Sequence, residues 1–160
     1  MPANKKPRKR YRPKPVMLNT IEYVQESVQP LAEHGTWLVD WGLKNHGAFD
    51  ALMKGQATKA HLDTLVAARN ITEALVVTLD GADNDGTLTR SAVALIEICD
   101  RANAGRGTAM KAPEIQAMRD LLALHDEILG VVSIKQFEVA LAYAKKEIAA
   151  GRAARLKEPA

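Results

Sequence analysis

From Met17 onward, apolar residues recur at intervals of three and four, the spacing that places side chains on one face of an α-helix. No stretch shows the strict alternation of apolar and polar residues that a half-buried β-strand needs. The pattern therefore predicts an all-α protein. The two clearest series are Ile115, Met118, Leu122, His125 and Leu129, and then Ile134, Phe137, Leu141, Ala144 and Ile148.

Capping and breaking residues between the apolar runs predict where about six helices begin and end. Asn19 and Glu22 have the spacing of a capping box, which predicts a first helix that ends near Pro30. Gly55 is a suitable residue to end the second helix, and the loop DGADNDG separates the third from the fourth. The remaining five helices are predicted over residues 36–54, 58–79, 87–103, 113–130 and 133–150.

The last two predicted helices carry matching apolar series and are separated by a short turn between Gly130 and Ser133. Two such faces joined by a tight turn are typical of an antiparallel αα-hairpin. A chain of 160 residues is long enough to bury one sizeable core. We therefore expect a single bundle-like domain over residues 17–150, with this hairpin at its end.

Residues 1–16 differ from the rest of the chain in composition. They hold four prolines, and the first 15 residues contain seven basic side chains and no acidic one. Because proline removes a backbone donor and like charges repel, we expect an extended arm that is flexible when free. The remainder has 15 basic and 19 acidic residues, and residues 151–160 form a short, weaker basic tail.

The arm predicts binding to the phosphate backbone of DNA or RNA, because Lys and Arg neutralise phosphates and release condensed counterions. Such binding is independent of sequence and sensitive to salt. The stretch RYRP resembles the Arg-Gly-Arg-Pro centre of an AT-hook, but Tyr11 replaces the glycine and would clash in the groove. An acidic protein partner or a purely solubilising tail are alternatives. The candidate contacts are Lys5, Lys6, Arg8, Lys9, Arg10, Arg12 and Lys14.

Trp37 and Trp41 lie one helical turn apart in the second predicted helix. Tryptophan is enriched at the centres of protein interfaces, so the pair is a candidate contact with a partner protein. The same spacing suits packing in the core. The sequence leaves both interpretations open.

Three features suggest metal binding or catalysis, and each lacks a partner that the chemistry needs. The loop before the fourth helix aligns with an EF-hand, but Gly81 and Ala92 occupy the positions of its first and last carboxylates. His125 and Asp126 resemble the dyad of helical metal phosphohydrolases, yet no aspartate follows them. The place of His125 in the apolar series of its helix favours a hydrogen-bonded core residue instead. Cys99 lies on an apolar helix face, where a thiol is inert. We therefore expect no metal, no cofactor and no enzymatic activity.

The chain has one cysteine, no apolar run of the length that spans a bilayer, and no secretory signal at its start. These features predict an intracellular protein without a disulfide framework or a membrane partner.

Four stretches look like parts of short proteins that bacteriophages and prophages of proteobacteria encode. They are YRPKPV (11–16), LVDWGLKNHGAFDAL (38–52), GQATKAHLDTLVAARNITEAL (55–75) and LALHDEIL (122–129). The resemblance implies a setting in the bacterial cytoplasm or in a virion, and it implies no activity and no functional residue.

Together these features predict a non-enzymatic phage accessory protein. The arm would bind nucleic acid non-specifically, and the helical domain would supply partner specificity or homo-oligomerisation. One alternative is a protein-binding module that inhibits or adapts a host or phage protein. Another is a component of the virion or of its assembly.

Overall fold

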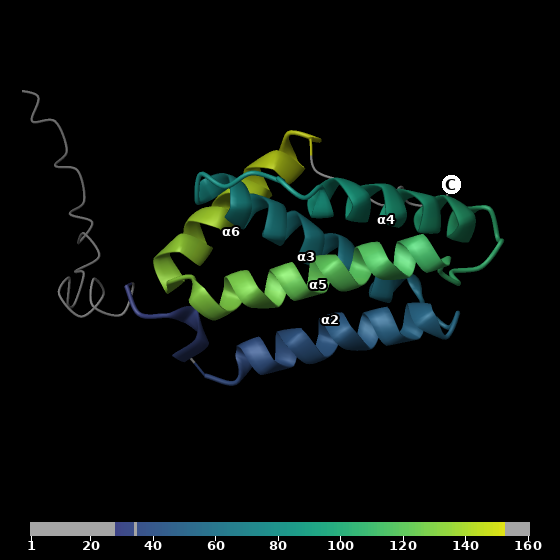
Figure 1. The fold of residues 1–160 in the computed structure, drawn as a ribbon, viewed down its shortest axis with the longest axis horizontal. Helices are drawn as coiled ribbons and strands as arrows, with labels where there is room; N and C mark the ends of the chain where they lie inside the picture. The colour runs from purple at the N-terminus through teal and green to yellow at the C-terminus, as the bar shows by residue number, and fades with distance from the viewer. Residues whose placement is uncertain (1–27, 34, 153–160) are drawn as a thin grey trace, which may run out of the picture.

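The structure is a computed structural model that describes residues 28–33 and 35–152, except for the side chain of Trp37. Within this part of the chain there are only helices and one isolated bridge, so the predicted all-α class is confirmed (Figure 1). A 3-10 helix, η1 (Leu31–Glu33), precedes five α-helices. These are α2 (Trp37–Met53), α3 (Lys59–Thr78), α4 (Thr87–Asn103), α5 (Ala112–Val131) and α6 (Ile134–Ala149).

The predicted helix boundaries agree closely with the structure wherever a cap defines them. Gly55 follows α2 with φ +66° and donates its N–H to the carbonyl of Leu52 at 3.0 Å. Ser133 and Gln136 form the predicted capping box of α6, with the Ser133 N–H donating to Gln136 Oε1 at 2.8 Å. Gly130 does not end α5, which continues to Val131.

The first predicted helix lies mostly outside the described residues, as do the arm and most of the basic tail. At its expected end, residues 28–30 are not helical. They form a turn and a bend that end in an isolated bridge from Pro30 to Ser133 at the junction of α5 and α6, where Leu31 donates to the Val132 carbonyl at 2.8 Å. The described elements are therefore five α-helices and one 3-10 helix, and the predicted count of six α-helices stays unconfirmed.

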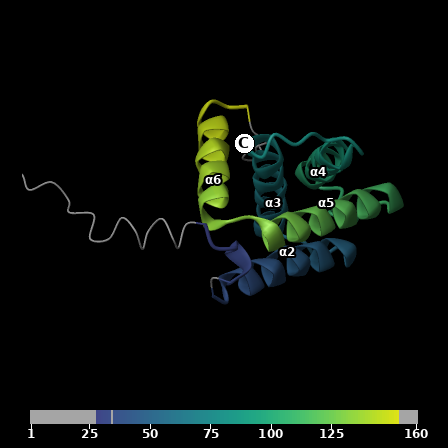
Figure 2. The same cartoon turned by 60° about the vertical axis from the view of Figure 1, so that its left-hand side comes forward.

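The predicted hairpin of the last two helices is wrong. α6 leaves the end of α5 at a steep angle and packs on α3, and in Figure 2 these two stand upright while α5 and α2 lie across them. Val132 and Ser133 both have extended backbones (ψ 148° and 161°), which turn the chain away from α5. The antiparallel partner of α5 is α4, which runs beside it in Figure 1.

Helix α3 is the centre of the fold, because it packs against each of the other four α-helices. Two apolar clusters form the core. The first joins the end of α2, the start of α3, α4 and the first half of α5, and includes Leu52, Leu65, Ile98, Met118 and Leu121. The second joins η1, the end of α3, the end of α5 and α6, and includes Leu31, Leu75, Leu129, Phe137 and Ala140.

Candidate functional site: a buried histidine and a small pocket

Of the sequence-predicted site residues, Trp41 is the one whose side chain the structure describes. All seven basic residues of the arm lie outside the described part of the chain, and so does the side chain of Trp37, whose backbone begins α2. Trp41 is half-buried inside the fold. Its ring meets Phe137 edge-on at 5.6 Å between centroids and lies 6.5 Å from the ring of His125. These contacts favour a packing role for Trp41.

The acidic loop before α4 uses its carboxylates to hold the start of that helix. Asp83 accepts hydrogen bonds from the N–H groups of Leu88 and Thr89, each at 2.9 Å. Burial raises the pKa of Asp83, but the hydrogen bonds from Thr89 and Leu88 outweigh it and leave the pKa below its ordinary value. Asp85 accepts from the Thr87 hydroxyl at 2.7 Å. Both carboxylates therefore serve as helix caps.

Two other chemical candidates also have structural roles. Cys99 is buried in the first cluster, and burial raises its thiol pKa to about 11, so it is not a thiolate at neutral pH. His61 accepts the N–H of Thr58 through Nδ1 at 3.0 Å and so caps α3. Within residues 28–33 and 35–152 no group of three or more His, Cys, Asp or Glu side chains could hold a metal ion.

His125 and Asp126, the neighbouring pair on α5, point in opposite directions and make separate contacts. Asp126 faces outward and lies 2.8 Å from Nε2 of His46 on α2, with both side chains about half exposed. His125 points the other way and is 1% exposed. The two side chains of the pair therefore do not act on one centre.

His125 is held by one hydrogen bond to α3. The hydroxyl of Thr72 donates to the Ala68 carbonyl at 2.8 Å, and its oxygen lies 2.9 Å from Nδ1 of His125. Because the hydroxyl proton is already used, Nδ1 carries a proton and donates it to Thr72. This assignment leaves the lone pair of Nε2 as the second polar group of the ring.

That lone pair has no hydrogen-bond partner within the part of the chain that the structure describes, although the atom is buried. A buried acceptor normally has a partner, because leaving it without one costs about 1–3 kcal/mol. Burial lowers the pKa of His125, and the nearby charge of His46 acts in the same direction against the opposing effect of Asp126. The imidazole is therefore neutral at neutral pH.

His125 also lines a pocket of about 150 Å³ between α2 and α3. Its wall is mostly apolar, with Asn45 and Thr64 as polar groups and Lys44 among the exposed residues. The arrangement is a small apolar space that contains a buried hydrogen-bond acceptor. The lining residues are Trp41, Lys44, Asn45, Thr64, Ala67, Ala68, Ile71 and His125.

The sequence placed His125 on the inner face of its helix and assigned it to the core, and burial confirms this. Its partner Thr72 and the pocket residue Asn45 were not predicted as site residues. A buried asparagine or threonine within an apolar series is a usable signal for a polar contact. The partner of such a buried polar residue depends on how the helices pack. The contact between Thr72 and His125 therefore cannot be predicted from the sequence pattern.

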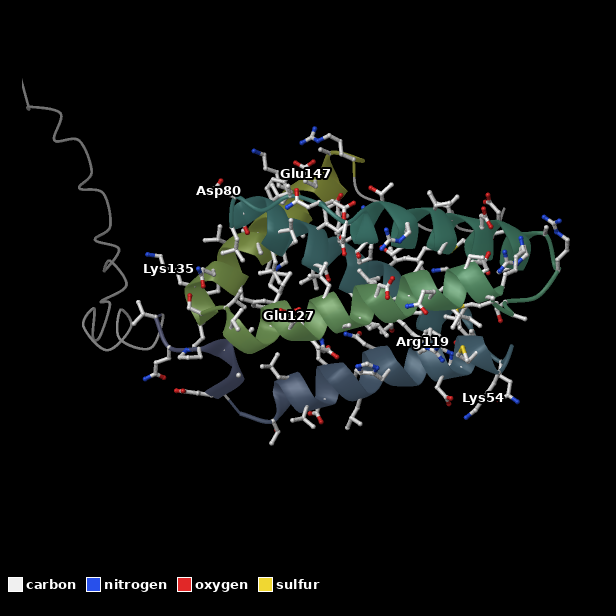
Figure 3. The ribbon with its side chains drawn as sticks, in the orientation of Figure 1. Lys54, Asp80, Arg119, Glu127, Lys135 and Glu147 are labelled. Carbon is white, nitrogen blue, oxygen red and sulfur yellow. The ribbon has the colours of Figure 1, made fainter. Side chains whose placement is uncertain are left out.

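In the described body, acidic residues outnumber basic ones, and just over half of the basic side chains form ion pairs. This part of the chain has 13 Lys and Arg residues against 16 Asp and Glu residues. Figure 3 shows Lys54, Arg119 and Lys135 at separate places, with Glu127 between Lys135 and Arg119 in this view. Seven of the 13 cations form ion pairs, namely Lys54, Lys59, Arg69, Arg90, Arg101, Lys111 and Arg152.

Among the helices that the structure describes, none is both long and apolar enough to cross a membrane. No protein-family model matches the chain, and neither a curated protein nor a solved structure is detectably similar to it. The resemblance to phage and prophage proteins therefore stays a prediction.

Proposed function

We propose that the protein is a phage accessory protein of the bacterial cytoplasm or the virion, and that it binds nucleic acid through its N-terminal arm. The helical body supplies partner specificity or oligomerisation. The observation that carries the proposal is the separation of charge. Seven basic residues and no acidic one occupy the first 15 positions, whereas acids outnumber bases in the described body.

The ion pairs of the body support this division of roles. A cation that already faces a carboxylate is a weaker phosphate ligand, because the carboxylate repels the phosphate that would approach. More than half of the body's cations are paired in this way. Affinity for a phosphate backbone is therefore expected to come from the arm.

Binding of this kind has a defined salt dependence. Each phosphate that is neutralised on duplex DNA contributes about −0.9 to the slope of log K against log salt concentration. If most of the seven arm charges engage, the slope approaches about −5. Such contacts carry no sequence information, so any selectivity arises in the helices.

The test is a mobility-shift titration with duplex DNA at several salt concentrations, using two variants of equal net charge. The first variant replaces Lys5, Lys6 and Lys9 by glutamine. The second replaces Lys135, Lys145 and Lys146, three exposed lysines of α6, by glutamine. The first change is expected to make the slope less steep by about 3, and the second by less than about 1.

Equal losses in the two variants would contradict the proposal, because they would show that net charge and not the arm determines binding. Absence of any shift by the full chain at about 50 mM salt, where phosphate contacts are strong, would remove nucleic acid as the partner.

In that second outcome the protein-binding alternative stands, with its contact surface on α2. Val39 and Leu43 lie one turn apart there and are 62% and 68% exposed. They are better candidates for a partner contact than Trp41, which packs inward on Phe137.

A further inference from the structure

The pocket at His125 combines two features that together point to a bound molecule. A small space is open between α2 and α3, and the neutral imidazole in its wall has a lone pair with no partner in the described part of the chain. Stability alone would favour an apolar residue at this place, because a buried acceptor without a partner is costly. The arrangement is therefore better explained by a molecule that donates to Nε2.

The size of the pocket limits what can enter. An apolar cavity of about 150 Å³ accommodates one benzene-sized ring, and this pocket has the same volume. Trp41 supplies an aromatic wall, and Ala68 and Ile71 supply aliphatic surface. A flat, single-ring molecule therefore fits both the volume and the wall.

The polar groups of the pocket define where the donor of that molecule must be. His125 lies at the buried end, where its Nδ1 is already committed to Thr72. Lys44 is exposed, and Ala67 is the exposed residue that α3 contributes to the wall. The ring therefore enters with its donor first, from the side where Lys44 and Ala67 reach the surface.

We propose that this pocket binds a small neutral molecule, a single aromatic ring that bears one O–H or N–H group and donates a hydrogen bond to Nε2 of His125. The site is independent of the basic arm, and its ligand is independent of nucleic acid.

The probe for the test is phenol, with toluene as a ring of similar size that has no donor. The full chain, labelled with ¹⁵N, is titrated with each compound to about 10 mM while the imidazole nitrogen signals are followed by NMR. Phenol is expected to move the Nε2 signal of His125 in a saturable way. The exposed imidazole of His46 serves as an internal reference.

Toluene is expected to bind roughly two- to tenfold more weakly than phenol, which is the range that one net hydrogen bond provides. Saturation that is equally tight for toluene would overturn the proposal, because Nε2 would then take no part. An Nε2 signal that phenol leaves unchanged would also overturn it, since a resident water or a closed pocket would then explain the site.

Two matched substitutions locate the binding. Ala67→Phe places a ring at the exposed edge of the pocket, and Ala142→Phe makes the same change on the exposed face of α6. Both alter exposed positions, so both variants should fold. Phenol binding is expected to be lost in the first variant and kept in the second. Equal binding by both would overturn the assignment to this pocket.

Discussion

At the scale of single residues, His125 shows how a titratable side chain can be a core residue. Its Nδ1 donates to Thr72, and its ring lies within packing distance of Trp41. A neutral imidazole is stable at this buried position, whereas a charged imidazolium would need solvation that the core does not provide. The residue therefore connects the stability of the fold to pH.

Stability is expected to decrease when the pH falls below about 6.5. Burial holds the pKa of His125 in the folded protein below its ordinary value of 6.5. At a pH between the folded and unfolded pKa values, the unfolded chain is protonated at His125 and the folded chain is not. The stability associated with neutral His125 is complete above pH 6.5 and is lost as the pH falls through the folded pKa. The slope is at most about 1.4 kcal/mol per pH unit for one proton. Urea unfolding at pH 6.5, 6.0, 5.5 and 5.0 measures it.

The variant His125→Gln should flatten this slope even if it lowers the overall stability. His46→Gln, which changes an imidazole on the surface, should leave most of the slope in place. A slope that persists unchanged in His125→Gln would show that another group binds the proton.

At the scale of elements, the ends of α4 and α5 are joined by a buried ion pair. Glu114 is 4% exposed and accepts two hydrogen bonds from the guanidinium of Arg101, at 2.6 and 2.7 Å. It also accepts the N–H of Lys111 at 2.7 Å, which caps α5. One carboxylate therefore closes the loop between the helices and caps the second of them.

Glu114→Gln is expected to lower the free energy of unfolding by about 3 kcal/mol, because the mostly buried guanidinium of Arg101 loses its paired carboxylate and keeps only the charge of Glu97 nearby. Chemical denaturation at pH 7 measures the loss. Asp50→Asn is the control, since its pair with Lys54 is exposed and contributes less than about 1 kcal/mol. Losses of equal size in the two variants would contradict the special role of Glu114.

The ion pair of Arg101 and Glu114 makes the stability of the fold depend on pH in a second range, below that of His125. Burial raises the pKa of Glu114, but the hydrogen bonds from Arg101 and Lys111 outweigh it and hold the pKa below its ordinary value of 4.5. The stabilisation is therefore complete above pH 4.5 and is lost as the pH falls through the folded pKa. In Glu114→Gln this acid-dependent part of the stability curve should be absent.

At the scale of the whole molecule, the two clusters differ in how many elements they hold together. The first is shared by four helices, whereas α6 enters only the second, through Phe137, Ala140 and Ala144. Two of these three buried side chains are single methyl groups, and the larger Ile134, Leu141 and Tyr143 of α6 are only partly buried against the cluster. Helix α6 packs mainly against α3.

We expect α6 to open before the rest of the fold. In native-state hydrogen exchange, its amides should exchange at a lower opening free energy than those of α3 and α5. Ala144→Gly should lower protection in α6 by more than Ala142→Gly does. Both changes cost helix propensity of about 1 kcal/mol, and only Ala144 also loses a buried contact. Exchange of α6 together with α3 would show one cooperative unit instead.

The elements of this protein could be predicted from its sequence because their causes are local. The bounds of α4 agree with the prediction at both ends, and Gly55, Ser133 and Gln136 act as the sequence indicated. Helical spacing also identified the buried positions Met118, Leu122 and Leu129. Periodicity and capping are properties of a few neighbouring residues, so they are readable without the fold.

The candidate site was only half predictable. His125 was identified as a core residue, but its partner Thr72 is 53 positions away in the sequence. The pocket exists because α2 and α3 pack at a distance that leaves room beside Trp41 and Ala68. That distance depends on every side chain between the helices and has no local signature.

The sequence by itself determined that residues 35–152 are helical, where most of these helices begin and end, and that the first 15 residues carry a concentrated positive charge. Only the tertiary structure decided which helices are neighbours. Similar apolar spacing predicted a hairpin of the last two helices, yet two extended residues direct α6 to α3 and leave α5 to α4. The apolar face of a helix predicts that the helix packs against another element, but it does not identify that element.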